Sequence, residues 1–330
     1  MVITQTPLRI SFVGGGTDFK EFYSIDGGAV VSTAIDKYVY VIVKERFDDK
    51  IVLSWTKKEI VQSVDEIQHE LIREAMRKTG VAKGIEAITV ADIPSEGSGL
   101  GSSSSLTVGL LNAFYAYQGE SVSAERLAQE ACDIEIGILK KPIGKQDQYI
   151  AAYGNLRRIS FRADASVEVE KLSISDETRR ILNSNFMLFY TNRTRSSAPI
   201  LTEQKSNIAN KLPILQQMKN QVEEMKQIVQ NGHPEMLAQL LNRGWQLKKQ
   251  LADSITSAEI EAMYTAALEA GAGGGKIAGA GAGGFLLLYC EPQNQEKVRK
   301  ALSGYREMPF LLERDGSKII FNMRRDTWKI

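Results

Sequence analysis

The segment that decides the fold is Pro94-Ser95-Glu96-Gly97-Ser98-Gly99-Leu100-Gly101-Ser102-Ser103-Ser104-Ser105. It follows a strand-like run, residues 86–91, and leads into a helical pattern, residues 103–117. Glycines let the backbone approach an anion closely, and the free amides and dipole of a helix N-terminus favour negative charge. The segment therefore predicts an anion-binding loop, suited to phosphate, formed by Gly97, Ser98, Gly99, Leu100, Gly101, Ser102, Ser103 and Ser104.

Taken alone, this loop has a second interpretation as a plain strand-loop-helix junction that binds nothing. No Lys-Ser or Lys-Thr pair closes it, so it is not a Walker loop. The acidic residue that a dinucleotide fold places downstream of its loop is also missing, which weakens an oxidoreductase interpretation. Ser102 and Ser103 offer hydroxyls to phosphate oxygens or to a magnesium ion.

A second glycine-rich segment covers residues 7–18 and ends in Gly14-Gly15-Gly16-Thr17-Asp18, with Arg9 near its start. A carboxylate accepts charge-assisted hydrogen bonds from the neighbouring hydroxyls of a polyol, so Asp18 is a candidate sugar ligand. By itself, the segment is also compatible with a hairpin turn and a solvated aspartate.

A third segment, residues 271–284, is rich in glycine and leads into an apolar, strand-like run. Ordering many glycines costs conformational entropy, and a surface linker would not end at so apolar a strand. We therefore expect a closely packed loop that touches a ligand or another loop, with a flexible linker as the alternative.

Candidate catalytic side chains lie around the turn at Pro142. Asp147 and Lys145 follow this turn, and Glu135 lies on the predicted helix before it. Phosphoryl transfer to a hydroxyl needs a held nucleotide, a metal that neutralises charge and a carboxylate that orients or deprotonates the hydroxyl. Asp147, Lys145 and Glu135 could meet these needs, and an exposed Asp/Lys pair is the alternative.

The composition excludes several other classes of protein. Lys and Arg number 41 against 40 Asp and Glu, so no overall charge would attract nucleic acid or a membrane surface. No apolar run approaches the ~20 residues of a membrane helix, and no HExxH, GxSxG or Cys/His arrangement supports zinc hydrolysis or acyl transfer. Cys132 and Cys290 lie in apolar surroundings without ligand spacing, which predicts reduced thiols and a cytoplasmic location.

The 330 residues favour two domains, and the composition changes near residue 184. Before this point we expect short strands at 9–13, 28–32, 38–43 and 51–55, a helix at 65–78 and a helix capped by Ser123. After it, residues 199–251 are mostly helix formers, broken at 231–234. The expected class is α+β, with a nucleotide-binding domain at 1–184 and a second domain at 185–330.

In their order, the three glycine-rich segments resemble the three signature motifs of the GHMP kinases, the superfamily of galactokinase, homoserine kinase, mevalonate kinase and phosphomevalonate kinase. The resemblance covers nearly the whole chain. It implies an N-terminal domain similar to ribosomal protein S5 domain 2, a ferredoxin-like C-terminal domain, and ATP and Mg²⁺ as cofactors. It also implies Ser103 and Glu135 as metal ligands, Asp147 as base or positioning carboxylate, and Arg9 beside the transferred phosphate. The expected substrate residues include Gly15, Gly16, Thr17, Asp18 and Gly281.

Within this family, the triple glycine replaces two side chains that contact the sugar in galactokinase. Together with residues 27–38, it resembles the branch that phosphorylates D-glycero-D-manno-heptose 7-phosphate. The resemblance implies transfer to the anomeric C1 hydroxyl, giving the 1,7-bisphosphate for surface-polysaccharide or GDP-heptose precursors. A phosphorylated substrate needs cations, and Arg193 and Arg195 are the candidates because guanidinium groups suit phosphate; solvated arginines are the alternative.

Two other functions stay open at this point. One is a kinase of a free sugar such as L-fucose, whose kinases resemble this sequence more than galactokinase does. The other is a non-catalytic sugar- or nucleotide-sensing relative, against which the presence of both Glu135 and Asp147 argues. The expected partners are ATP and a small sugar phosphate, without nucleic acid or membrane, and a homodimer is a further expectation.

Overall fold

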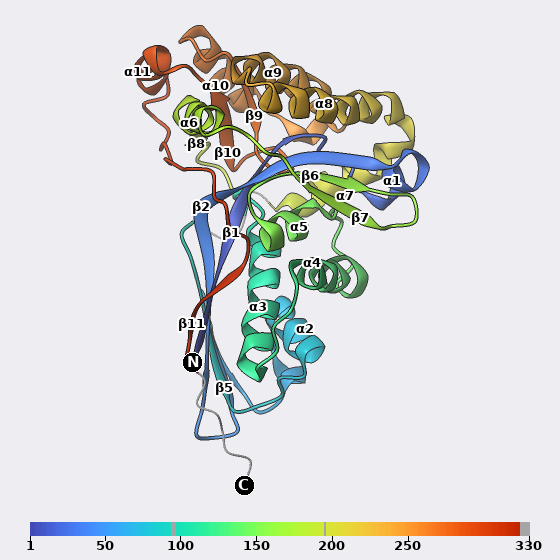
Figure 1. Cartoon of the computed structure of the whole chain (residues 1–330), viewed down its shortest axis with the longest axis vertical. Coiled ribbons are helices and arrows are strands. Elements are labelled where there is room, and N and C mark those ends of the chain that lie inside the picture. Colours follow the sequence, from blue (N-terminus) through green and yellow to red (C-terminus); the bar gives the residue numbers. More distant parts are fainter. Residues whose placement is uncertain (94–96, 195, 324–330) are drawn as a thin grey trace.

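The computed structural model describes residues 1–93, 97–194 and 196–323, and it shows two sheets with helices around them (Figure 1). Within these residues the larger sheet has eight strands, in the order β11-β1-β2-β5-β3-β4, with β6 pairing with β2 and β7 with β6. The strand bounds are β1 Val2–Val13, β2 Gly28–Glu45, β3 Ile51–Ser54, β4 Lys58–Val61, β5 Ile85–Ala91, β6 Leu156–Phe161, β7 Val167–Lys171 and β11 Lys318–Asn322.

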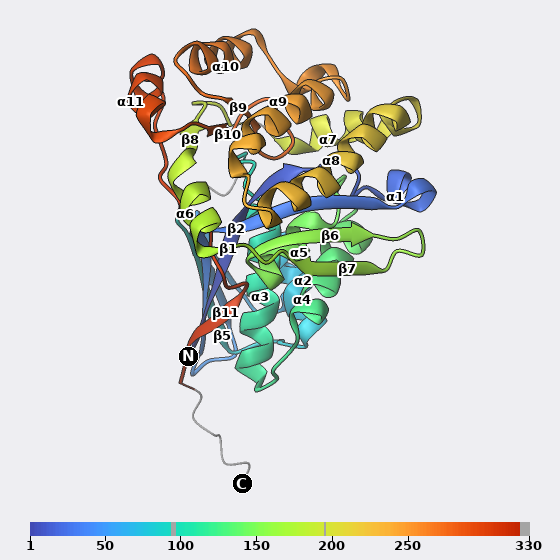
Figure 2. The ribbon, with the colours of Figure 1, turned by 45° about the horizontal axis from the view of Figure 1, so that its top comes forward.

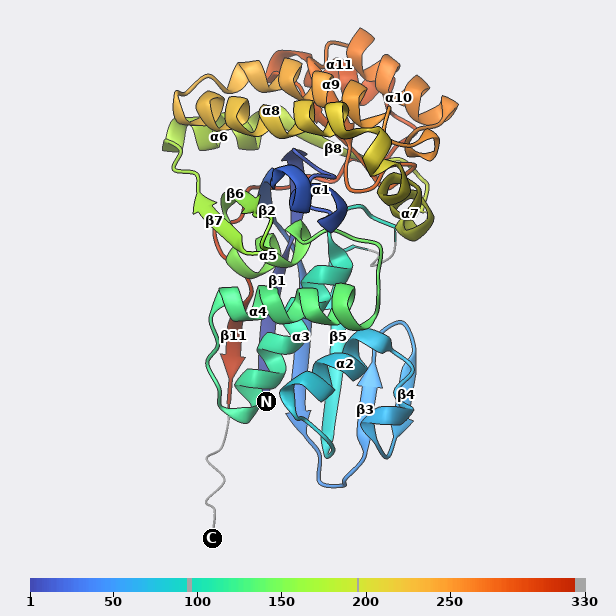
Figure 3. The same ribbon diagram turned by 90° about the vertical axis from the view of Figure 1, so that its right-hand side faces the viewer.

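Four helices cover one face of this sheet and form an apolar core with it. They are α2 (Glu70–Thr79), α3 (Ser102–Gln118), α4 (Ala124–Cys132) and α5 (Gln146–Tyr153), and they lie in front of the strands in Figure 3. The central helix α3 is buried along most of residues 102–116, so its apolar side chains do not form a single stripe. This burial fixes the position of its N-terminus, where the predicted phosphate loop ends.

The second half of the chain builds a smaller sheet and most of the remaining helices. Its three strands, in the order β8-β10-β9, are β8 Phe186–Tyr190, β10 Phe285–Tyr289 and β9 Gly274–Ile277, and all pair antiparallel. The other helices are α1 Lys20–Asp26, α6 Asp176–Asn185, α7 Ser197–Asn207, α8 Leu212–Gln230, α9 Leu237–Lys248, α10 Ala258–Glu269 and α11 Pro292–Ala301.

A shared apolar core joins the two halves. Leu8 and Val31 of the larger sheet belong to the same buried cluster as Val222 of α8, Leu241 of α9 and Leu287 of β10. Figure 2 shows α8 and α9 lying over the ends of β1 and β2. The two halves therefore meet along a packed surface, and residues from both reach the same region.

The division into domains at 1–184 and 185–330 stays a proposal. The strand β8 begins at Phe186, close to this boundary. The last strand, β11, pairs with β1 and so belongs to the edge of the larger sheet (Figure 1). A description by domains must therefore assign residues 318–322 to the first sheet.

Several local predictions are confirmed. The helix α3 and the strand β6 lie where expected, and Ser123 caps α4 by accepting a hydrogen bond from Arg126 N at 3.2 Å. Two predictions differ: the strands at 28–32 and 38–43 are one continuous strand, β2, and the helix at 65–78 begins only at Glu70, after a 3₁₀ turn at Val64–Glu66. Both cysteines are buried and unpaired. Among the helices of the described ranges, none has the length and apolarity to cross a bilayer.

Candidate active site

The predicted phosphate loop has the backbone shape that its sequence implies. Gly97, Gly99 and Gly101 adopt φ angles of 70°, 74° and 78°, a region that favours glycine. The loop ends at the N-terminus of α3, where Ser102 begins the helix and lies 3.0 Å, hydroxyl to hydroxyl, from Ser98. Leu100 and Ser104 are buried. A loop of this shape before a helix N-terminus is suited to hold phosphate groups.

The third glycine-rich segment packs directly against this loop. A Cβ on Gly99 would stand 2.4 Å from the carbonyl oxygen of Ala278, and a Cβ on Gly279 would stand 2.6 Å from Cα of Gly99. A Cβ on Gly284 would likewise stand 2.4 Å from the carbonyl oxygen of Ser98. The expectation of a closely packed loop is confirmed, with the difference that residues 274–277 form the strand β9.

A candidate magnesium site lies beside the start of α3. Ser103 Oγ donates a hydrogen bond of 2.7 Å to the carboxylate of Glu135, whose other oxygen accepts one of 2.9 Å from Gln148 Nε2. Glu135 is fully buried, which raises the pKa of its carboxyl, and it lies in a π-helix at Asp133–Ile138, an element that often occurs at functional sites. A hydroxyl and a carboxylate are hard oxygen donors that suit Mg²⁺, which takes its other ligands from phosphate and water. These residues therefore fit the ion.

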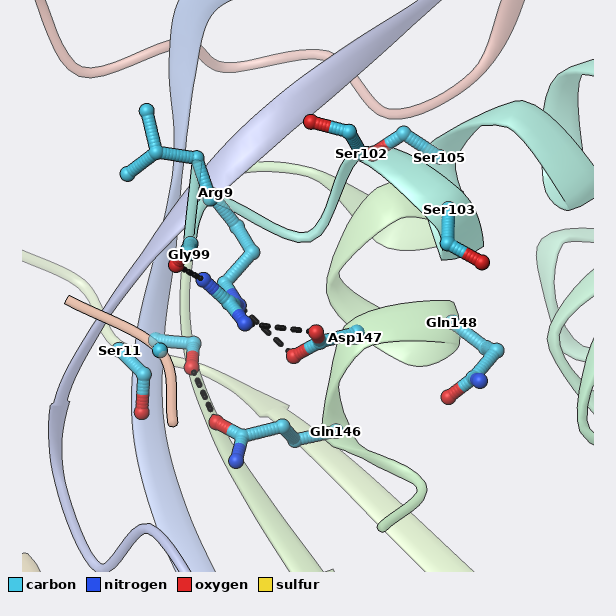
Figure 4. Close-up of polar contacts among 12 residues, drawn as sticks. Arg9, Ser11, Gly99, Ser102, Ser103, Ser105, Gln146, Asp147 and Gln148 are labelled. Atoms are coloured by element: carbon cyan, nitrogen blue, oxygen red, sulfur yellow. Dashed lines mark hydrogen bonds and ion pairs between the residues drawn. The ribbon is translucent and has the colours of Figure 1, made fainter. Parts of the chain in front are cut away.

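Arg9 and Asp147 form a bidentate ion pair at the centre of the site (Figure 4). The Nε to Oδ1 distance is 2.7 Å and the Nη2 to Oδ2 distance is 2.6 Å. The remaining nitrogen, Nη1, donates to the carbonyl oxygen of Gly99 at 2.6 Å. Since Arg9 lies on β1 and Asp147 in the first turn of α5, the pair links the larger sheet, this helix and the phosphate loop in one geometry.

Asp18 is buried next to the same helix, at the end of the first glycine-rich turn. Its Oδ1 accepts a hydrogen bond of 3.0 Å from the amide of Gly16, and its Oδ2 accepts one of 3.1 Å from Gln146 Nε2. Burial, and then the negative charge of Asp147, raise the pKa of the Asp18 carboxyl. Gly15 leaves space in front of it, because a Cβ there would meet nothing closer than Ser11 Oγ at 3.9 Å. The turn thus presents a carboxylate with room for a ligand.

Thr17, which was expected to bind the substrate, has its hydroxyl engaged within the turn. Thr17 Oγ1 lies 2.8 Å from the carbonyl oxygens of both Gly14 and Ala29 and accepts a hydrogen bond from Ala29 N at 3.0 Å. The residue has no exposed surface. Its placement is that of a residue that holds the turn carrying Gly15 and Asp18.

A pocket lies in front of this turn and is lined by residues of both halves. From the first half it includes Arg9, Ser11, Gly15, Gly16, Asp18, Gly144, Gln146 and Asp147, and from the second half Gln204, Lys248, Lys276 and Gly279. Lys276 Nζ donates to the carbonyl oxygens of Ser11 at 2.9 Å and Phe12 at 3.0 Å, and Lys248 Nζ donates to that of Gly279. Burial lowers the pKa of Lys248 to about 8 and that of Lys276 well below its usual value. The pocket therefore combines two carboxylates with three cations.

Three of the predicted site residues lie elsewhere. The Lys145 ammonium donates to the carbonyl oxygen of Ala165 at 3.0 Å and lies 5.1 Å from the ring centre of Tyr23, so it is engaged outside the pocket. Arg193 forms an ion pair with Glu259 beside a separate hollow. Gly281 packs against the carbonyl oxygen of Ile255. Arg195 lies outside the described residues.

Little in the sequence indicates that the two lysines lie in the pocket. Lys248 belongs to a long stretch of helix formers in which a lysine is ordinary. The available signal was spacing, because Leu241, Trp245 and Lys248 recur at i, i+4 and i+7 and so share one face of α9, with Trp245 fully buried. Lys276 stands among glycines, where only the pairing of β9 with β10 shows that it is in a strand.

These elements are those of a kinase family. The model of the GHMP kinases N-terminal domain matches residues 63–155, and the model of the GHMP kinases C-terminal domain matches residues 223–306. The chain belongs to the GHMP kinases, a family of ATP-dependent kinases, and it has their two-domain fold of mixed helices and sheets. The predictions of family and fold class are confirmed.

Among its relatives, the chain is 30% identical over 316 residues to the D-glycero-alpha-D-manno-heptose 7-phosphate kinase of Campylobacter jejuni, covering 91% of this chain and 92% of that protein. It is 28% identical to the L-fucokinase/L-fucose-1-P guanylyltransferase of Bacteroides fragilis, of which it covers 36%. A crystal structure of a D-glycero-D-manno-heptose 1-phosphate kinase from Bacteroides thetaiotaomicron superposes with a TM-score of 0.83 at 25% identity, over 98% of this chain and all of that one. The chain thus resembles sugar-phosphate kinases along its whole length.

Proposed function

We propose that this protein transfers the terminal phosphoryl group of ATP to the anomeric C1 hydroxyl of D-glycero-D-manno-heptose 7-phosphate, giving the 1,7-bisphosphate. The observation that carries the proposal is the Arg9–Asp147 pair, because it sets a carboxylate and a guanidinium beside the phosphate loop and in front of Asp18. The choice of a heptose phosphate rests on the full-length similarity to the kinase of Campylobacter jejuni.

In this proposal, residues 97–104 hold the nucleotide phosphates through backbone amides and the N-terminus of α3. Ser103 and Glu135 would hold Mg²⁺, which neutralises charge on the phosphates when it is bound. The close contact of Gly279 with Gly99 keeps the loop in this shape before the nucleotide arrives. Such preorganisation reduces the cost of ordering the site during catalysis.

The acceptor lies in the pocket, with Asp18 accepting hydrogen bonds from sugar hydroxyls. Asp147 orients the anomeric hydroxyl and takes its proton as the oxygen attacks the phosphorus. Arg9 keeps the Asp147 carboxylate in one orientation and places positive charge near the transferring group. Gly15 leaves room beside Ser11 and Gln146 for the sugar, because a Cβ there would meet nothing closer than 3.9 Å among the described residues.

A panel of acceptors tests this function most directly. ADP release would be measured with the purified protein, ATP and Mg²⁺ against the heptose 7-phosphate, the unphosphorylated heptose, L-fucose, galactose and mevalonate. We expect the heptose 7-phosphate to give the highest kcat/KM, with ³¹P NMR showing a new anomeric phosphate. Preferential turnover of L-fucose would support the free-sugar alternative, and no turnover of any acceptor would support a sensing role.

The same assay should also test transfer to a hydroxyl other than the anomeric one, because a structural neighbour is described as a heptose 1-phosphate kinase. Supplying heptose 1-phosphate as the acceptor distinguishes the two, since its product would carry the new phosphate on a primary hydroxyl.

A cytoplasmic location and a homodimer belong to the proposal as well. The two unpaired, buried thiols are compatible with a reducing compartment.

A further inference from the structure

We infer that Lys248 is a phosphate-binding residue of the pocket and that it binds a phosphoryl oxygen of a substrate. The inference rests on the proposed kinase function and adds a residue from the second half of the chain to its site. Lys248 ends α9, lies against the pocket and is only 5% exposed. The N–H groups of its ammonium that have no partner in the part of the chain that the structure describes indicate this phosphate-binding role.

The ammonium of Lys248 has donor capacity that the protein leaves unused. It carries three N–H groups, and within the described residues its one hydrogen-bond partner is the carbonyl oxygen of Gly279. Ser11 Oγ, in the same pocket, is also buried without a partner among these residues. Buried polar groups in native proteins are normally satisfied, so two incomplete groups facing one pocket indicate a ligand that completes them.

The other basic side chains of the pocket make more hydrogen bonds within the protein. Lys276 is held by two carbonyl oxygens, those of Ser11 and Phe12. Arg9 is bound to both oxygens of Asp147 and to Gly99. Arg193, an expected phosphate ligand, is paired with Glu259 outside this pocket. Lys248 is therefore the pocket cation best placed to accept a new anion.

The electrostatic surroundings favour the same conclusion. Burial, and then the positive charge of Arg9, lower the pKa of Lys248 to about 8, while Asp18 opposes this shift. A buried ammonium with one neutral partner is costly, and a phosphate oxygen supplies the missing charge and hydrogen bonds. Binding of a phosphate would thus stabilise the charged form of Lys248 and gain affinity from it.

Two phosphates meet this description, the phosphate already on the acceptor and the phosphoryl group in transfer. Kinetics of Lys248→Met separate them, with Lys249→Met as the matched control because Lys249 pairs with Glu261 at 2.9 Å and is not among the described residues that line the pocket. Loss of a charge-assisted contact should lower kcat/KM about 10- to 100-fold. If the phosphate already on the acceptor is the ligand, the KM of the heptose 7-phosphate rises and turnover of the unphosphorylated heptose is unaffected. If the phosphoryl group in transfer is the ligand, kcat falls equally for both acceptors.

The overturning result is a Lys248→Met enzyme that behaves like Lys249→Met with both acceptors. Folding is not expected to interfere, because the change removes a buried charge and keeps most of the side-chain length. Lys248→Gln serves if melting shows that the methionine variant is unstable. A binding test stands apart from the choice of substrate. Inorganic phosphate should raise the melting temperature of the wild type and of Lys249→Met more than that of Lys248→Met. This difference survives if the heptose assignment fails, whereas equal shifts contradict the lysine's role.

Discussion

A Cβ atom on Gly144 would stand 1.9 Å from Oδ2 of Asp18, so the backbone before α5 lies directly against the carboxylate that we assign to the sugar. This contact, together with the hydrogen bonds from Gln146, fixes where Asp18 points. The helix that carries Asp147 and the turn that carries Asp18 are thereby positioned relative to each other.

Gly144→Ala should displace Asp18 and weaken acceptor binding. We expect a rise of at least about tenfold in the KM of the sugar and a loss of about 1–3 kcal/mol in stability, because the added methyl overpacks a buried contact. Steady-state kinetics and chemical denaturation measure both effects. Gly304→Ala is the control, since a Cβ on Gly304 would meet nothing within 4 Å among the described residues. An unchanged KM in Gly144→Ala would contradict the assigned contact.

Asp147→Asn should abolish most of the turnover and spare the nucleotide. The amide cannot take the proton of the acceptor hydroxyl, so we expect kcat to fall about 100- to 10,000-fold. Asp147 contacts Arg9, while the phosphates are assigned to residues 97–104, so calorimetry with a non-hydrolysable ATP analogue should give a nearly unchanged Kd. Asp164→Asn, in an exposed turn, serves as control. Turnover near the wild-type level would remove Asp147 from the chemistry.

Ser103→Ala and Glu135→Gln should each increase the Mg²⁺ concentration needed for half-maximal activity, by at least about tenfold. The reason is the loss of one oxygen donor from a site that has few protein ligands. Titration of activity with Mg²⁺ at saturating ATP measures this. Asp133→Asn lies on the same π-helix, is exposed and pairs with Lys78, so its Mg²⁺ dependence should match the wild type. Identical titrations for all four proteins would place the metal elsewhere.

Asp18 should make the protein more stable as the pH falls. Its folded-state pKa is raised above 3.8 by burial and by Asp147, so the folded chain holds the proton more tightly than the unfolded chain does. The ionised carboxylate therefore costs stability above its folded pKa, and this cost disappears as the pH falls toward 3.8. The melting temperature of Asp18→Asn relative to wild type should be higher at pH 7 than at pH 4. A difference that is constant with pH would show that Asp18 does not titrate in this way.

The glycine segments made the family and the shape of the loop before α3 predictable, because positive φ angles before a helix need those residues. Asp18, Arg9 and Asp147 were also found as candidates, since each lies in a segment with a recognisable pattern. The roles expected for Lys145 and Arg193 depended on side-chain direction, which local sequence does not determine. Lys145 turns toward Ala165 and Tyr23, and Arg193 toward Glu259. Lys248 reaches the pocket through the packing of α9 against the rest of the protein. The sequence around Lys248 does not indicate this packing.

The contact between Gly99 and Gly279 also bears on how the protein is made. A ribosome produces Arg9, the serines of the loop and Asp147 well before it reaches Gly279. A nascent or truncated chain that ends before β9 lacks the backbone against which the loop around Gly99 takes its shape. The backbone surroundings of the proposed phosphate loop are thus complete only in chains that extend beyond Gly279.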